Sequence, residues 1–245
     1  MRIAGLFLFC IVSVSGQLNN ATLPLPPAMP SPGEGIPDLN GIWAMPYTTD
    51  LTKLLGEPVP FTRYGAEVFK NHMGGDDPHG FCQPTGPTRA FHQPYPFQIV
   101  QTAGMLIVLF EIDHNYRRIF TDGRKHPDDL DHTWYGDSIG TYSGNTLTVD
   151  TIGLNDKTWL DTAGHQHSDQ LRITETFTKT GPDSVTWTVT YNDPVFYTKP
   201  YSVTLPMRRQ QYDILEMICM ENNLDLPHLI TSQPKLHEGK AAEAK

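Results

Sequence analysis

Between residues 97 and 209 the chain alternates apolar and polar positions with a period of two, and turn residues interrupt the alternation. In the segment 185–191, the large side chains fall on one face and the threonines on the other. This alternation is typical of antiparallel strands that bury one face. It predicts strands at 97–102, 105–112, 115–121, 134–142, 146–151, 171–178, 185–191 and 201–207.

Fewer elements are predicted outside this region. Gly41-Ile42-Trp43 begins the ordered part, residues 64–71 are the one fair helix candidate, and residues 213–219 fit a last strand or a short helix. Strands that follow one another in the sequence are expected to pair directly, which favours a closed barrel over a sandwich. We therefore expect an all-β fold, an antiparallel up-and-down, lipocalin-like barrel of about 8–10 strands with one short helix.

The two ends of the chain differ from this core. Residues 1–16 combine a short basic start, an apolar run and small residues, the pattern of a cleavable signal peptide. That run is shorter than the roughly 20 residues of a membrane-spanning helix. Residues 17–37 form a proline-rich tether and residues 231–245 a polar tail, which leaves 38–230 as one barrel domain. We expect a secreted or periplasmic protein without a membrane span; the oligomeric state stays open.

Charge and cysteine content narrow the expected partners. The formal net charge is −9, and loss of Arg2 with the signal peptide makes it −10. Such an acidic surface repels phosphate backbones, so we expect no nucleic-acid partner. Cys82 and Cys219 are the cysteines that follow the signal peptide, and an oxidising compartment favours a disulfide between them over two buried thiols.

The long connections indicate where a site would lie. If each strand reverses the one before, the turn 103–104 and the connections 122–133, 153–170 and 192–200 meet at one mouth of the barrel. Long loops at one end of a rigid barrel are a common place for a small-molecule site. We expect substrate contacts from Asp122, Arg124, Trp134, Asp137, Trp159 and Tyr197.

The connection 153–170 holds the densest group of reactive side chains. His167 is a candidate general acid or base, which Asp161 or Asp169 would orient. His165 and His167 have a spacing that can hold a divalent metal, although no cofactor is required. The alternative is a pair of loop histidines that form hydrogen bonds with neighbouring carboxylates.

Glu175 shares a strand face with apolar residues and should point into the barrel. A buried carboxyl group is either a catalytic acid or base or one half of an internal ion pair. Arg118 is the expected partner in the second, favoured interpretation.

Two short motifs match catalytic sequence patterns only in part. Residues 136–140 match G-x-S-x-G, but they lie inside a predicted strand rather than at a strand-to-helix turn. Their glycines are expected to allow curvature or close packing. Residues 165–169 match the H-x-H-x-D of metallo-β-lactamases, but Gln170 stands where a further histidine would follow.

Several segments resemble a family of secreted bacterial proteins that has no established activity. These segments are DGRKHP (122–127), TWYGDSIGTYSGNTLTVDT (133–151), TWLDTAGHQHSD (158–169), NDPVFYTKPY (192–201) and CMEN (219–222). Gly41-Ile42-Trp43 also resembles the G-x-W of lipocalins. The resemblance implies a shared lipocalin-like barrel and a shared site to which Asp122, Arg124, Asp137, Asp161 and His167 belong.

The polar residues expected at the barrel mouth determine how we rank the functional hypotheses. A plain carrier needs an apolar opening, whereas this one is rich in aspartate, histidine and arginine. We therefore place an enzyme, a lyase, isomerase or hydrolase that uses His/Asp acid–base chemistry on a small molecule, ahead of a non-catalytic lipocalin-like carrier. A purely structural or interaction module is the third hypothesis.

Overall fold

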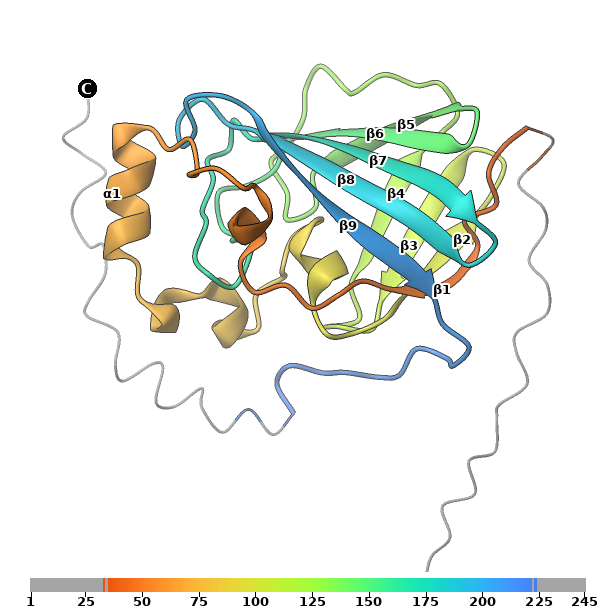
Figure 1. Ribbon diagram of the computed structural model, residues 1–245, viewed down its shortest axis with the longest axis horizontal. Coiled ribbons are helices and arrows are strands. Elements are labelled where there is room, and N and C mark those ends of the chain that lie inside the picture. Colours follow the sequence, from red (N-terminus) through yellow and green to blue (C-terminus); the bar gives the residue numbers. More distant parts are fainter. Residues whose placement is uncertain (1–32, 34, 222, 224–245) are drawn as a thin grey trace, which may run out of the picture.

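The computed structural model describes residues 33, 35–221 and 223. Nine strands pair in sequence order, and β1 also pairs with β9, which closes a barrel (Figure 1). The strands are β1 Gly41–Ala44, β2 Phe97–Gln101, β3 Met105–Phe110, β4 Tyr116–Phe120, β5 Asp137–Ser143, β6 Thr146–Ile152, β7 Arg172–Gly181, β8 Ser184–Asn192 and β9 Tyr201–Arg209. The helices are α1 Arg63–Asn71 and the short 3-10 helices η1 Leu51–Leu54, η2 Gly74–Asp76, η3 Pro78–Phe81 and η4 Arg89–His92.

The prediction of an all-β barrel with one short α-helix is confirmed. One predicted strand starts late: β5 begins at Asp137 because Gly136 adopts a left-handed φ of 65° and breaks the extended backbone. Residues 213–219 form neither a strand nor a helix. The predicted signal peptide, the polar tail and most of the tether lie outside the described residues. The disulfide between Cys82 and Cys219 is confirmed.

One strand pair departs from the up-and-down pattern. β4 and β5 are parallel and are joined through the single pair Phe120 and Ile139. Two parallel neighbours need a connection that returns to the starting end. Residues 121–136 make this return: Thr121 N–H donates to Gly104 at one end, whereas Thr133 N–H donates to Gly153 at the other.

The barrel therefore has two unlike ends. The turn end carries the β2–β3, β5–β6 and β7–β8 turns, and the helical end carries α1, the 3-10 helices and the connections 153–171 and 193–200 (Figure 1). The prediction that all long connections meet at one mouth is wrong for the turn 103–104 and for the start of 122–133. These lie at the turn end, because the parallel pair reverses the expected direction of every later strand.

The helical end is closed by the segment that links β1 to β2. Phe91 of η4 is fully buried, and its ring lies 4.7 Å from Phe97 and 5.2 Å from Phe110, centroid to centroid. It also lies 5.8 Å from Phe177 and 5.7 Å from Trp187, on the far wall of the barrel. At this level the barrel interior is packed with aromatic side chains.

Glu175 points into the barrel as predicted and is fully buried, but its predicted partner is wrong. Arg117, not Arg118, reaches it, with distances of 2.5 Å and 3.1 Å between guanidinium nitrogens and carboxylate oxygens. β4 alternates with Arg117 and Ile119 inward and Tyr116 and Arg118 outward. Because Tyr116 faces outward, the arginine that faces inward is Arg117, one position before the predicted Arg118.

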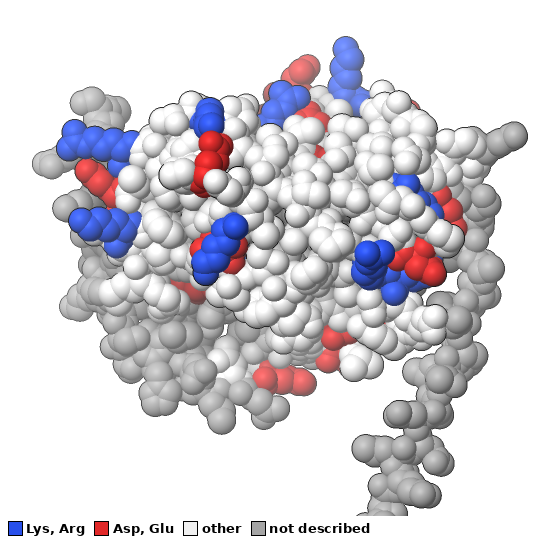
Figure 2. Space-filling model, viewed as in Figure 1, with Lys and Arg blue, Asp and Glu red and all other residues white. Residues whose placement is uncertain are grey.

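The outer surface mixes both signs of charge. In Figure 2 the basic and acidic side chains of the visible face mostly lie next to one another, with uncharged surface between these groups. Within the described part of the chain, no helix is long and apolar enough to cross a membrane.

Candidate functional site

The connection between β6 and β7 makes a tight turn at the helical end. Trp159 and Gln166 pair as an antiparallel bridge, and Leu160 N–H donates to the carbonyl of His165 at 2.7 Å. Gly164 has a φ of 95°, which favours glycine, and a Cβ there would lie 2.3 Å from His72. The sequence therefore brings Asp161 and His165 to one side of the turn.

Asp161 is fully buried and is fixed by backbone donors. Its oxygens accept the N–H groups of Leu51 at 3.0 Å, Ala163 at 3.1 Å and His165 at 3.3 Å. A short polar side chain that accepts from the backbone two residues on is typical of such turns. The bond to Leu51 also ties the turn to the start of η1, so the carboxylate holds one orientation.

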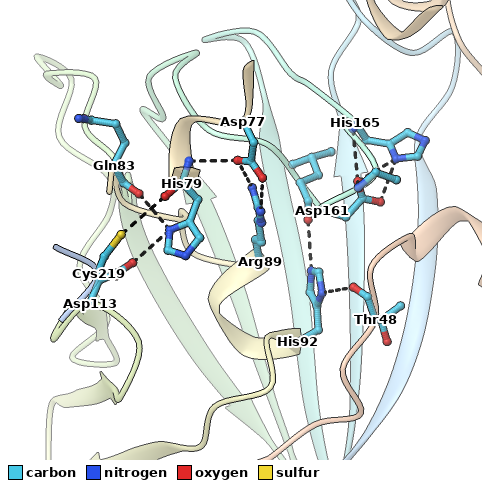
Figure 3. A network of polar contacts seen from close by, with 12 residues as sticks. Thr48, Asp77, His79, Gln83, Arg89, His92, Asp113, Asp161, His165 and Cys219 are labelled. Atoms are coloured by element: carbon cyan, nitrogen blue, oxygen red, sulfur yellow. Dashed lines mark hydrogen bonds and ion pairs between the residues drawn. The ribbon is translucent and has the colours of Figure 1, made fainter. Parts of the chain in front are cut away.

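The imidazole of His165 is oriented by this carboxylate. Its Nδ1 lies 2.8 Å and 2.9 Å from the two oxygens of Asp161, and Figure 3 shows the two side chains facing each other. The ring stacks on Phe69 at 4.5 Å and on Phe61 at 5.8 Å and is 1% exposed. Nε2 forms no hydrogen bond with any described residue, so one nitrogen of this buried, well-held imidazole has no partner among them.

Asp50 lies close to this pair and completes a group that could hold a metal ion. One ligand atom each of Asp50, Asp161 and His165 lie within 4.8 Å of one another. Burial tends to raise the pKa of Asp50, but the hydrogen bonds from Thr52 and the nearby His165 together lower it. Of the two histidines predicted to hold a metal ion, His165 belongs to this group and His167 does not.

His167 is buried and uses both ring nitrogens. Nε2 lies 2.7 Å from the Thr158 hydroxyl, and Nδ1 lies 2.9 Å from the Ser168 carbonyl oxygen. Burial lowers the pKa of His167, which keeps the ring neutral. The geometry gives this side chain a role in holding the loop and leaves it no free nitrogen for catalysis.

The other predicted catalytic residues lie apart from this pair. Asp169 is exposed, 3.8 Å from His132. The buried Glu175 carboxylate is engaged by Arg117 and by the Trp187 indole, which donates at 3.0 Å.

The predicted substrate-binding residues divide into three groups. Asp122 and Arg124 form an exposed ion pair at the turn end, with the shortest N–O distance 2.5 Å. The hydrogen bond from Arg124 lowers the pKa of Asp122. Trp134 and Asp137 lie in a cleft beside β4, and Trp159 and Tyr197 lie near His165.

A cleft of about 660 Å³ lies between α1 and the turn that carries His165. His72 lines it, and the buried pair lies behind this lining: the His72 ring is 5.0 Å from Phe69, which stacks on His165. The lining residues are Tyr64, Glu67, Val68, Asn71, His72, Asp76, Pro78, Asp156, Lys157, Trp159 and Gln166.

A polar network that sequence reasoning missed holds the closing segment against the barrel (Figure 3). Arg89 binds Asp77 through two hydrogen bonds of 2.8 Å and 2.6 Å, and His79 lies 3.3 Å from Asp113. His92 places its nitrogens 2.8 Å from the Thr48 carbonyl and 3.2 Å from that of Leu160, and burial lowers its pKa. The segment between β1 and β2 has no apolar periodicity, so Cys82 was its one sequence feature that suggested attachment to the rest of the protein.

A comparison of the chain with protein-family models, with curated proteins and with solved structures found no match. The resemblance to a secreted bacterial family therefore stays a prediction, and the function has to be argued from the site.

Proposed function

We propose that the protein is an enzyme that converts a small molecule by acid–base chemistry at the helical end of its barrel. His165 is the proposed general base or acid, and Asp161 is the residue that orients it. The observation that carries the proposal is that Asp161 holds Nδ1 while Nε2 has no partner among the described residues. A base fixed by a third group is the common arrangement of acid–base and nucleophilic sites.

The neighbouring cleft supports a substrate with an apolar body and polar substituents. Trp159 and Tyr64 offer aromatic surface, whereas Lys157 and Asp156 offer charge. Lyase, isomerase and hydrolase reactions all need a proton to be moved by a positioned group, and the geometry of the pair supports this role. The proposal therefore names these three reaction classes and no single one of them.

A location outside the cytoplasm is part of the proposal. The disulfide between Cys82 and Cys219 supports it, because disulfides persist in oxidising compartments.

The proposal is tested with a reporter of general-base strength. 5-Nitrobenzisoxazole opens to a coloured phenolate once a base removes one proton, so it needs no knowledge of the natural substrate. We expect the protein to accelerate this reaction and His165→Gln to remove at least nine-tenths of the acceleration. His132→Gln, which changes an exposed histidine, is the control. Equal rates for the two variants, in proteins with equal melting temperatures, would refute the proposal.

A divalent metal ion is the second candidate, favoured by the closeness of Asp50 to the pair. Imidazole and carboxylate ligands suit zinc and other first-row metals. Equilibrium dialysis with Zn²⁺ decides between the two. Stoichiometric binding that Asp50→Asn weakens would support the metal site, and binding below one equivalent would leave acid–base chemistry without a metal.

A further inference from the structure

A second cleft, of about 340 Å³, lies on the side of the barrel and is separate from the His165 site. It follows β4 along the edge that faces β5, where Phe120 and Ile139 are the one pair of residues in register between the two strands within the described residues. The lining residues are Asn115, Tyr116, Arg117, Arg118, Phe120, Thr133, Trp134, Tyr135, Gly136, Asp137 and Ser138.

The walls of this cleft are largely aromatic. Tyr116 and Phe120 come from the outer face of β4, and Trp134 and Tyr135 come from the segment that leads into β5. The Tyr135 hydroxyl is buried and has no hydrogen-bond partner among the described residues. Facing aromatic walls favour a flat apolar ligand.

The backbone of β4 adds polar groups along the cleft. Asn115 and Thr121 form hydrogen bonds toward β3, with Phe110 and Gly104. Alternate residues of an antiparallel strand direct their N–H and C=O groups to opposite sides. The backbone groups of Tyr116 and Arg118 therefore face the cleft, where β5 does not pair with them.

The charged side chains of the cleft differ in their partners. Arg117 is paired with Glu175, and Asp137 lies 2.5 Å from His126 Nδ1. Arg118 is exposed, and the arginine ion pairs in the described part of the chain involve other arginines. One cation without a counter-ion thus stands beside aromatic walls.

We propose that this cleft binds a small planar anion, an aromatic or other conjugated ring system that carries a carboxylate or sulfonate group. The ring system lies against Tyr116 and Trp134, because the Arg124 guanidinium already covers the Phe120 ring at 3.8 Å, and its anionic group is held by the guanidinium of Arg118. The site is distinct from the His165 pair and requires no catalysis, so it also gives the carrier hypothesis a location.

The test uses two dyes that share one skeleton. 8-Anilinonaphthalene-1-sulfonate carries a sulfonate, and N-phenyl-1-naphthylamine is its uncharged analogue. Fluorescence titrations are made on the full chain and on Arg118→Gln, Trp134→Ala and Arg208→Gln. Arg208 is an exposed arginine on β9 and serves as the matched control.

We expect one saturable site for the sulfonate. Arg118→Gln should weaken the sulfonate about tenfold and leave the uncharged dye unchanged, because one charged hydrogen bond is lost. Trp134→Ala should weaken both dyes, and Arg208→Gln neither. The proposal is overturned if the protein shows no saturable sulfonate binding, if Arg118→Gln and Arg208→Gln behave alike, or if Arg118→Gln affects both dyes equally. Thermal melting of each variant shows that the fold is kept.

Discussion

Two buried pairs, each of a carboxylate and a basic side chain, occupy different parts of this molecule, and they differ in what they leave unbonded. In the barrel interior, the guanidinium of Arg117 is bonded to Glu175, Ser138 and Thr151, with Thr151 Oγ1 at 2.8 Å. At the helical end, Asp161 is saturated by donors, but His165 keeps Nε2 free of described partners. A fully bonded pair holds strands together, whereas a pair with one free nitrogen can act on a ligand.

The scaffolds of the two pairs differ as well. Arg117 and Glu175 project from β4 and β7, whose backbone positions are fixed by neighbouring strands. Asp161 and His165 lie four residues apart on one connection, and their geometry depends on the turn and on its bond to Leu51. We therefore expect changes at the first pair to affect stability and changes at the second to affect chemistry.

The largest expected effect comes from breaking the interior pair. Arg117→Met leaves the fully buried Glu175 without its cation, which should lower the free energy of unfolding by about 3–5 kcal/mol. Urea unfolding measures it. The double variant Arg117→Met/Glu175→Leu should recover most of the loss, because no charge is left unpaired. A single variant as stable as the unmodified protein would remove the distinction between the two pairs.

Acidification should have an intermediate effect on the free energy of unfolding. It acts through two histidines whose ring nitrogens are both bonded, so that they are fully bonded like the interior pair. Burial lowers the pKa of His92 and of His167 from 6.5. Below about pH 6.5 the unfolded chain therefore binds protons that the folded chain does not. Stability that is complete above this pH should be lost on acidification, by up to about 1.4 kcal/mol per pH unit for each histidine.

The variant His167→Gln isolates one of these contributions. Unfolding free energies at pH 7.0 and 5.5 should differ less in this variant than in the unmodified protein. Asp113, whose pKa burial raises, acts in the opposite direction at the acid end of the range, and the comparison cancels it because both proteins contain it. Identical pH dependences would contradict the neutral, fully bonded state of His167.

The smallest expected effect concerns the Tyr135 hydroxyl, which is buried near the Thr85 hydroxyl but forms no hydrogen bond with it or with the other described residues. A hydroxyl that forms no hydrogen bond contributes no stability, so Tyr135→Phe should change the free energy of unfolding by less than about 0.5 kcal/mol or raise it slightly. Chemical denaturation measures this. A loss above about 1 kcal/mol would mean that the hydroxyl is bonded in the folded protein.

The sequence predicted the strands well and the site only in part. Period-two alternation placed β6 and β8 closely, because each residue's face follows from its neighbours. The parallel β4–β5 pair was missed, since alternation carries no information on strand direction. Arg118 was named as the inward arginine because it alternates with the aromatic Tyr116, which was expected to face inward but is 59% exposed.

Within the candidate site, Asp161 was expected to orient a histidine, but the histidine named was His167. Both histidines lie on the same extended stretch, and only the hydrogen bonds distinguish them. Asp50 and Leu51 lie more than 100 residues earlier, and Leu51 and Asp161 are 110 positions apart. Such long-range contacts leave no local pattern in the chain.

The central claim is that His165 has its proton on Nδ1, toward Asp161, and an unshared electron pair on Nε2. Proton–nitrogen correlation NMR of ¹⁵N-histidine-labelled protein reports the protonation of each ring nitrogen directly. At pH 8 we expect a protonated Nδ1 and an unprotonated Nε2 for the signal that His165→Gln removes, and a mixture of both tautomers in Asp161→Asn. A His165 signal with the proton on Nε2 would contradict the account.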